Sequence, residues 1–301
     1  MTGVAATARP ARVAVLAHAK KTVGGGLDEL RSQIAGHGVD DLLWHEVPKS
    51  KKAPKQAQKV LDAGADLVFV WGGDGMVQRC ADALAGSGIP IAIVPAGTAN
   101  LLAHNLGIPQ DVGEAVKIGF SGARRPLDLG RVNGEHFAVM AGVGFDAEMI
   151  AGADRGLKDK LGQLAYFWTG ARALARSRTR TTVEVDGAPW FEGPASCVLV
   201  GNVGRITGGV PAFDDARPDD GVLEIGVATA EGPVQWARTL GRMTVGRSER
   251  SPFVRITRGK KIRVRLAEPR TYELDGGARD ATTLVKVHIA PAAVTVCVPR
   301  G

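Results

Sequence analysis

Apolar and polar positions follow two different periods along this chain of 301 residues. In the first half, short apolar runs alternate with segments in which apolar residues recur at helical spacing. The runs cover 12–16, 42–47, 66–71 and 89–95, and the helical segments cover 27–35, 54–63, 76–84, 101–106 and 112–120. Alternation of strand and helix predicts a parallel sheet with helices on both faces, so we expect an α/β domain here.

The second half changes to a strand period. Apolar and polar residues alternate over short segments separated by turn residues, which is typical of a half-buried antiparallel sheet. These segments are 182–185, 196–200, 222–227, 261–266, 284–289 and 293–298. We therefore expect a β-sandwich-like domain, interrupted by one basic amphipathic helix near 157–171. That helix is expected to pack its apolar face on the protein, with an anionic membrane surface as the alternative.

These patterns predict an α/β plus all-β protein with two domains. The expected limits are a disordered tail at 1–10, an α/β domain at 11–130 and a β-sandwich-like domain at 131–301. Ligand sites occur preferentially between domains, so the active site is expected in the cleft.

The amino-acid composition limits the kinds of binding partner that we expect. The formal net charge is +7, which favours nucleotides or anionic membrane surfaces as partners, while an aromatic content of 5% argues against a base-stacking surface for nucleic acid. The three cysteines stand far apart in apolar runs, as buried thiols of a reducing compartment do. No apolar run is long enough to span a membrane. We expect a cytoplasmic protein, with peripheral binding at the inner membrane face and a homodimer as open alternatives.

A glycine turn follows the apolar run at 66–71. It reads Gly72-Gly73-Asp74-Gly75 and leads into a helical segment. A strand, a glycine turn and a helix aim backbone N–H groups at a phosphate, and the carboxylate of Asp74 suits a metal-bound triphosphate. The alternative is a tight turn between a strand and a helix that binds nothing.

A second turn of this kind follows the run at 89–95. It contains Gly97, Thr98 and Asn100, whose side chains can cap a helix or bind a phosphate. The carboxyl ends of neighbouring parallel strands meet at one edge of a sheet, where open α/β sheets bind ligands. We therefore expect the two turns to lie side by side.

Together these motifs resemble the diacylglycerol kinase catalytic-domain family, which includes bacterial lipid kinases and the related sphingosine kinases. The resemblance spans nearly the whole chain, in the family's order. It rests on Gly-Gly-Asp-Gly at 72–75, Pro-Ala-Gly-Thr-Ala-Asn at 95–100, Leu-Gly-Ile-Pro at 106–109, Asp128, Gly-Val-Gly-Phe-Asp-Ala at 142–147, Gly-Asn at 201–202, Gly-Gly at 208–209, Pro-Ala at 211–212 and Asp-Asp-Gly-Val-Leu at 219–223.

The resemblance implies ATP and Mg²⁺ as cofactors and a nucleotide site on the glycine turns. The nucleotide-binding residues it implies are Gly72, Gly73, Asp74, Gly75, Met76, Val77, Gln78, Gly97, Thr98, Asn100 and Ser50. Asp74 is expected at the metal–ATP contact, and Asp128 in a polar network that links the metal to the hinge; a structural turn is the alternative for Asp128. Lys49, Lys51 and Lys52 flank Ser50 as phosphate ligands or as a solvated run. The loop at 18–26 stands in place of the family's Asn-Pro turn, either as a third phosphate loop or as a flexible connector.

The segment 219–223 resembles a structural magnesium site of the bacterial lipid kinases. Carried over, Asp220 supplies the carboxylate, and Arg217 and Val222 supply backbone carbonyls. Oxygen ligands of this kind suit Mg²⁺. A hairpin turn without a metal is the alternative.

Three departures from the family pattern stand out: Met76 replaces a usual Thr, Leu101 replaces a frequent Asp, and Gly277 stands where the family's proposed general base is acidic. Asp275 is the nearest carboxylate and is our candidate base, with Glu273 and Asp280 as others and a plain hairpin turn as the alternative. Arg279 could bind a phosphate instead.

The sequence thus predicts an ATP- and Mg²⁺-dependent kinase that transfers the γ-phosphate to diacylglycerol or a related lipid alcohol drawn from a membrane surface. The rivals are a kinase of a soluble alcohol or dinucleotide, as in the NAD kinases, and a binding protein that has lost catalysis.

Overall fold

The computed structural model of the chain describes residues 10–144, 178–206, 210–244 and 251–300. The amphipathic helix predicted near 157–171 and the motifs at 145–147 and 208–209 lie outside these residues. So does the predicted tail apart from Pro10. No helix of the described residues is long and apolar enough to span a membrane.

The chain forms two compact units. The first contains residues 1–127 and 292–301, and the second contains residues 128–291. The last ten residues thus belong to the first unit, whereas the sequence pattern had assigned them to the second domain. The cause is strand pairing: Thr295 and Val296 lie parallel to Pro90 and Ile91. Each unit is described by itself, and the expected cleft between domains stays a prediction.

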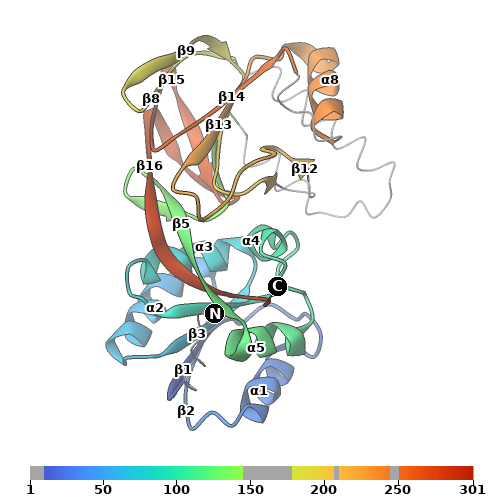
Figure 1. Cartoon of the computed structure of the whole chain (residues 1–301), viewed down its shortest axis with the longest axis vertical. Coiled ribbons are helices and arrows are strands. Elements are labelled where there is room, and N and C mark those ends of the chain that lie inside the picture. The colour runs from blue at the N-terminus through green and yellow to red at the C-terminus, as the bar shows by residue number, and fades with distance from the viewer. Residues whose placement is uncertain (1–9, 145–177, 207–209, 245–250, 301) are drawn as a thin grey trace, which may run out of the picture. The chain divides into compact units, whose positions relative to one another are not determined.

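A parallel sheet forms the middle of the first unit (Figure 1). Its order is β2-β1-β3-β4, and the end of β16 pairs beyond β4. The strands are β1 (Arg12–His18), β2 (Asp41–Val47), β3 (Leu67–Gly72), β4 (Pro90–Pro95) and β16 (Gly277–Val298). All six residues of β3 are buried, as a continuous apolar run predicts for a central parallel strand.

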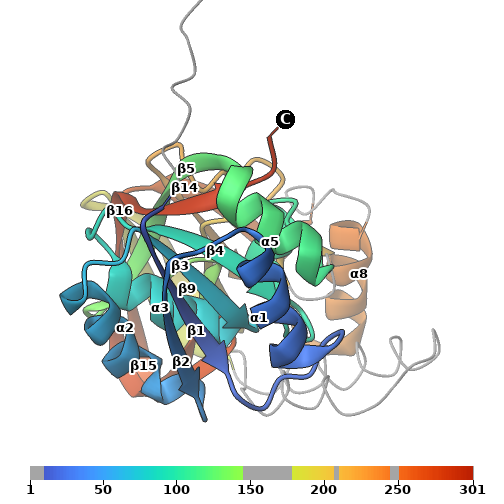
Figure 2. The same ribbon diagram turned by 90° about the horizontal axis from the view of Figure 1, so that it is seen from below.

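Helices cover both faces of this sheet. Figure 2 shows α1 and α5 on one side and α2 and α3 on the other. The helices are α1 (Gly26–Gly36), α2 (Ala53–Asp62), α3 (Asp74–Leu84), α4 (Leu101–Asn105) and α5 (Val112–Ser121), with a short 3-10 helix η1 (Ser50–Lys52) before α2. Their limits follow local signals: Pro54 stands in the first turn of α2, and Asp111 caps α5 by accepting the Glu114 amide at 2.9 Å. The predicted α/β architecture is confirmed.

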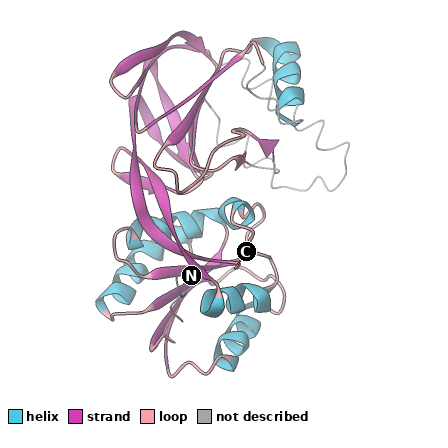
Figure 3. Cartoon of the chain, in the orientation of Figure 1, coloured by secondary structure: helices cyan, strands magenta, loops and turns pink. Residues whose placement is uncertain are grey.

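The described residues of the second unit form mainly strands, with one helix (Figure 3). Antiparallel pairing runs β14-β13-β10-β7-β15-β16, and a hairpin of β8 and β9 adds to β15. The strands are β5 (Ala123–Val132), β6 (Glu135–Phe137), β7 (Met140–Val143), β8 (Thr179–Val185), β9 (Ala188–Ala195), β10 (Cys197–Gly201), β11 (Arg205–Ile206), β12 (Val210–Pro211), β13 (Leu223–Ala228), β14 (Val254–Gly259) and β15 (Lys261–Leu274). The residues of β5 and β16 are divided between the two units.

Strand β15 changes its partner partway along its length. Its first part pairs with β8 and its second part with β7, with register shifts between Arg265 and Tyr272. Both parts send apolar side chains to one core, among them Ile262, Val264 and Leu274. The bend therefore lets a single strand serve both layers of the predicted β-sandwich-like domain.

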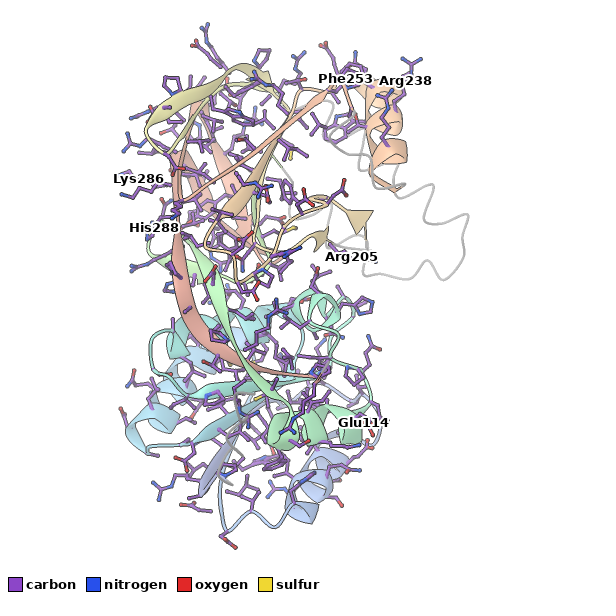
Figure 4. The ribbon with its side chains drawn as sticks, in the orientation of Figure 1. Glu114, Arg205, Arg238, Phe253, Lys286 and His288 are labelled. Atoms are coloured by element: carbon purple, nitrogen blue, oxygen red, sulfur yellow. The ribbon has the colours of Figure 1, made fainter. Side chains whose placement is uncertain are left out.

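Side chains of β16 alternate as the sequence pattern predicts. Val285 and Val287 are buried in the core, whereas Lys286 and His288 point away from it (Figure 4). The prediction of separate strands at 284–289 and 293–298 is wrong, because β16 is continuous through Pro291. The sequence pattern also missed helix α8 (Gly232–Thr244), whose Trp236 is buried.

Candidate functional site

The two glycine turns lie side by side at the carboxyl edge of the first unit's sheet. Gly72 and Pro95 are paired in register, and the Ala96 amide donates to the Gly72 carbonyl at 2.9 Å. A Cβ added to Gly73 would lie 2.9 Å from the Cα of Gly97, and one added to Gly97 would collide with the Cα of Gly73. The backbones touch, so only glycine fits at these two positions.

Asn100 closes the second turn. Its side-chain oxygen accepts the Gly97 amide at 2.8 Å, and its side-chain nitrogen donates to the Gly97 carbonyl at 2.9 Å. Its own backbone is left-handed, with φ of 47°, a conformation that Asn tolerates better than most residues. Because both polar atoms of the Asn100 side chain form hydrogen bonds with Gly97, this side chain stabilises the turn. Its predicted contact with a ligand stays a prediction.

Asp74 links the first turn to the helix after the second. One of its carboxylate oxygens accepts the Leu101 amide at 2.5 Å, at the start of α4. Burial raises the pKa of the Asp74 carboxyl, while hydrogen bonds from backbone amides, those of Leu101 and Leu102 foremost, act in the opposite direction. A nearby cation would favour the ionised form. The carboxylate thus links the two turns, and its predicted contact with a metal stays a prediction.

The remaining residues of the first turn differ in what they can offer a ligand. Gly73 is half-buried and Gly75 is exposed, and both stand at the start of α3, where helix amides lack carbonyl partners within the helix. Met76, Val77 and Gln78 have buried side chains, and the amides of Met76 and Val77 donate to the Gly73 carbonyl. These three side chains pack the helix beneath the turn, and the predicted contact of these residues with the nucleotide stays a prediction.

Thr98 and Ser50 lie at the same edge of the sheet. Thr98 is exposed between β4 and α4, and Ser50 is half-buried in η1, which follows β2 and contacts α3. Lys49, Lys51 and Lys52 are exposed around Ser50. The first unit therefore collects hydroxyl groups and positive charge near its two glycine turns.

The glycine loop after β1 does not resemble a third phosphate loop in its contacts. A carboxylate oxygen of Glu29 accepts the Gly25 amide at 2.7 Å and lies against Gly24. A carboxylate of the protein thus occupies the position that an anion would take, and it would repel a phosphate. The loop is tied to α1 rather than held open for a ligand.

Asp128 and the loop at 217–222 come together in the second unit. A carboxylate oxygen of Asp128 accepts the Gly221 amide at 2.7 Å, and the Asp128 amide donates to the Pro218 carbonyl at 2.6 Å. Asn202 donates to the Asp128 carbonyl at 2.8 Å. Asp128 thus belongs to a hydrogen-bond network that fixes the loop expected to hold the structural metal, and the predicted link of Asp128 to the metal of the nucleotide stays a prediction.

The loop itself offers few metal ligands. A carboxylate oxygen of Asp220 accepts the Val222 amide at 3.2 Å, which closes a turn at Gly221, where φ is 77°. The described residues contain no group of three His, Cys, Asp or Glu side chains able to hold a metal ion. One carboxylate with the carbonyls of Arg217 and Val222 is the donor set that remains for Mg²⁺, and this site stays a prediction.

The turn between β15 and β16 contains the candidate base Asp275. Its carboxylate accepts the amides of Ala138, Val139 and Met140 at 2.7, 2.9 and 2.8 Å. The residue is buried, and its φ of 46° places it in the turn that the Asp-Gly-Gly sequence predicts. Three amide donors tie this carboxylate to the backbone of residues 138–140, which lead into β7, so its geometry supports a structural role rather than the predicted role as a base.

Arg279 fills the space beside Gly277. Its guanidinium forms a two-pronged ion pair with Glu135, with the Nε–Oε2 distance at 2.7 Å, and donates to the Gly277 carbonyl at 2.7 Å. The ion pair raises the pKa of the Arg279 guanidinium. A Cβ on Gly277 would lie 2.7 Å from this guanidinium. The side chain of a base at this position would therefore have to displace Arg279, and Arg279 is committed to Glu135 rather than to a phosphate.

Glu273 is the unexpected residue of this segment. It is 1% exposed, and neither of its carboxylate oxygens has a hydrogen-bond partner. Burial, and then the nearby charge of Asp275, raise its pKa to about 8. In the sequence it was only one of several carboxylates near Gly277. The alternation of β15 gives no signal for this burial, because it places Glu273 on the face opposite to the core residue Leu274.

A substitution of Gly97 by Ala tests the contact between the two turns. The added Cβ meets backbone atoms of Gly73, which cannot move aside as a flexible side chain can. We expect Gly97→Ala to lower the free energy of unfolding by about 1–3 kcal/mol. Gly36→Ala is the control, because its Cβ has no atom within 4 Å. Thermal unfolding measures both; equal stability of the two variants would contradict the contact.

Asp275→Asn tests the structural role of the carboxylate. The substitution keeps the size of the side chain but replaces one acceptor oxygen by a donor that faces backbone amides. We expect the free energy of unfolding to fall by about 2–4 kcal/mol, measured by chemical denaturation. Asp280→Asn, in the exposed part of the same hairpin, should change it little. A fully stable Asp275→Asn protein would contradict this role.

The pH dependence of stability tests the burial of Glu273. The folded protein holds a proton on this group up to a pKa of about 8, whereas the unfolded chain releases it near the ordinary value of 4.5. Stability therefore falls as pH rises through this interval, by roughly 3–5 kcal/mol. We expect Glu273→Gln to remove this part of the loss, so that denaturation curves of the two proteins converge below pH 4.5. Parallel stability profiles would show that the group is not protonated in the folded state.

Comparisons with known proteins agree with this geometry. The diacylglycerol kinase catalytic domain matches residues 18–132, and the YegS C-terminal NAD kinase beta sandwich-like domain matches residues 138–298. The chain is 32% identical over 297 residues to a probable lipid kinase YegS-like protein of Pseudomonas aeruginosa, covering 96% of this chain and 95% of that protein. It is 30% identical over 219 residues to a diacylglycerol kinase of Bacillus subtilis, covering 70% and 71%.

A solved structure shares the fold. The crystal structure of a diacylglycerol kinase from Bacillus anthracis has a TM-score of 0.75 at 23% identity and covers 97% of this chain and 98% of that chain. The two family models together account for both units, and the relative from Pseudomonas aeruginosa matches over nearly its whole length. The chain therefore belongs to the diacylglycerol kinase catalytic-domain family of lipid kinases, with a YegS type of C-terminal domain.

Proposed function

We propose that this protein is an ATP- and Mg²⁺-dependent lipid kinase that phosphorylates the hydroxyl group of diacylglycerol or a related lipid alcohol. The observation that carries the proposal is the pair of touching glycine turns with the Asp74 carboxylate between them. Family membership supports a lipid kinase, and the relative from Bacillus subtilis bears the name diacylglycerol kinase.

The glycine turns fit a nucleotide. A Cβ at either Gly73 or Gly97 would fill the space where the backbones meet, and the N-terminus of α3 directs amides and the positive end of its dipole toward an anion. The amides at the start of α3 would bind phosphate oxygens, with Thr98 and Ser50 as further donors. Exposed lysines of η1 would add positive charge around them.

Asp74 would hold the metal. Its hydrogen bond from Leu101 fixes one carboxylate oxygen and thereby orients the other. When bound, Mg²⁺ would neutralise charge that develops on the transferred phosphoryl group. Leu101 provides no second carboxylate at this place, so Asp74 would carry this contact without the acidic neighbour that other family members often have.

We do not assign the role of general base to Asp275. Its carboxylate already accepts three amides, and a proton on it would disrupt the packing of β7 against the turn. Asp128 has a structural role in this proposal, because its carboxylate and its backbone amide both form hydrogen bonds with the loop at 217–222. Neither residue needs to touch the reacting atoms for these roles.

Asp74→Asn tests the proposal. Asparagine keeps an oxygen that can accept the Leu101 amide but lacks the negative charge that a metal requires. We expect a loss of lipid phosphorylation of at least about 100-fold, measured at a temperature where thermal unfolding shows that the variant is folded. The assay uses γ-labelled ATP, Mg²⁺ and a panel of detergent-dispersed lipid alcohols alongside water-soluble alcohols and NAD.

Asp28→Asn, an exposed substitution on α1, is the control and should keep full activity. Phosphorylation of a soluble acceptor alone would favour the soluble-alcohol kinase. Binding of ATP without transfer to any acceptor would favour a binding protein that has lost catalysis, a reading that Gly277 supports. Full activity of Asp74→Asn would remove Asp74 from the site.

A further inference from the structure

The hairpin of β15 and β16 has several carboxylates, and all but one have a visible task. Glu268 pairs with Arg270, Asp275 accepts three backbone amides, and Asp280 is exposed to solvent. Glu273 is buried to 99% of its surface and makes no hydrogen bond with either oxygen. A buried polar group without a partner is costly, and few occur in folded proteins. This one therefore requires an explanation.

The register of the strands shows where Glu273 stands. It is paired with Gly142 of β7, and Gly142 is paired with Leu199 of β10. Neighbours in the strands, such as Leu274 and Ala141, belong to the core of the unit. Since side chains alternate along a strand, Glu273 and Leu199 share the sheet face opposite to that core, with a glycine between them.

The nearest strand neighbours of Glu273 on this face are apolar or lack a side chain. Leu199 is buried, Gly142 has no side chain, and the electrostatic partners of Glu273 are Asp275 and the buried thiol of Cys197. Asp275 brings no donor, since its carboxylate is occupied by amides. The described residues thus place a hydrogen-bonding group in apolar surroundings and provide it with nothing to bond. A ligand that is apolar apart from a hydroxyl group would complement such a site.

We infer that Glu273 binds the free hydroxyl group of the lipid alcohol in the second unit. This inference rests on the proposed function for the class of ligand, but not on transfer of a phosphate. The hydroxyl and the Glu273 carboxyl would satisfy one another, while the acyl chains stay among apolar side chains. A soluble polyol would leave its other hydroxyl groups without partners, so the site should prefer a lipid with one free hydroxyl group.

A matched pair of ligands tests this inference without ATP. The first is 1,2-dioctanoylglycerol, and the second is 1,2-dioctanoyloxypropane, which is the same molecule without the hydroxyl group. Both are dispersed in the same nonionic detergent, and binding to the full chain is measured by calorimetric titration. We expect the unmodified protein to bind the hydroxylated lipid about 5- to 10-fold more tightly, as one buried hydrogen bond provides.

Glu273→Met removes the polar group at similar length, and it should bind both ligands equally. Glu273→Gln restores a hydrogen-bonding oxygen and should recover at least part of the preference. Glu224→Gln is the control, because Glu224 is also a buried glutamate of this sheet but pairs with Arg258 at 3.9 Å. This variant should discriminate as the unmodified protein does. Thermal unfolding confirms that each variant is folded.

Discrimination that persists in Glu273→Met would overturn the inference, as would an unmodified protein that binds both ligands equally. If Glu273→Met does not fold, the other two proteins still test the inference. The unmodified protein should prefer the hydroxylated lipid, and Glu273→Gln should keep part of that preference. Failure of the proposed function has a different signature: the hydroxyl preference is present, but no lipid is phosphorylated when ATP and Mg²⁺ are added.

Discussion

The contact between Gly73 and Gly97 is the constraint on which the first unit's site depends. Two neighbouring strands end at the same edge of the sheet, and their turns can lie side by side only because neither has a side chain there. Asp74 and Asn100 then hold the arrangement from both sides, one by bonding the start of α4 and the other by bonding Gly97. The glycines thus set the distance between the turns, and the polar side chains fix their orientation.

Local patterns in the sequence were sufficient for the elements of the first unit, because buried parallel strands and amphipathic helices leave separate periods. They predicted that the glycine turns lie together, since strand order and strand direction determine that. The sequence patterns did not show that the side chains of Asp74 and Asn100 would form hydrogen bonds with the turns themselves. Their partners, Leu101 and Gly97, depend on the geometry of the folded backbone.

The roles of the acidic residues in the second unit were harder to predict, because their partners are also set by the folded backbone. Which carboxylate of residues 273–280 is held by amides, and which partner Arg279 finds, depends on contacts between residues more than a hundred positions apart, as between Asp275 and Ala138 or Arg279 and Glu135. The spacing of residues along the sequence does not reveal these long-range contacts. The continuity of β16 was missed because Pro291 usually interrupts a strand, yet it is tolerated here where the strand passes from one unit to the other.

The return of the C-terminal residues to the first unit has a consequence for synthesis of the protein on the ribosome. Strand β4 has β3 on one side, and on the other side its partner is the end of β16, only a few residues before the C-terminus. The nascent first unit must therefore wait, with one edge of its sheet unpaired, until the whole second unit has been translated. Exposed edges of this kind invite pairing with other chains. The order of elements along the chain thus places completion of the first unit's sheet after translation of the second unit.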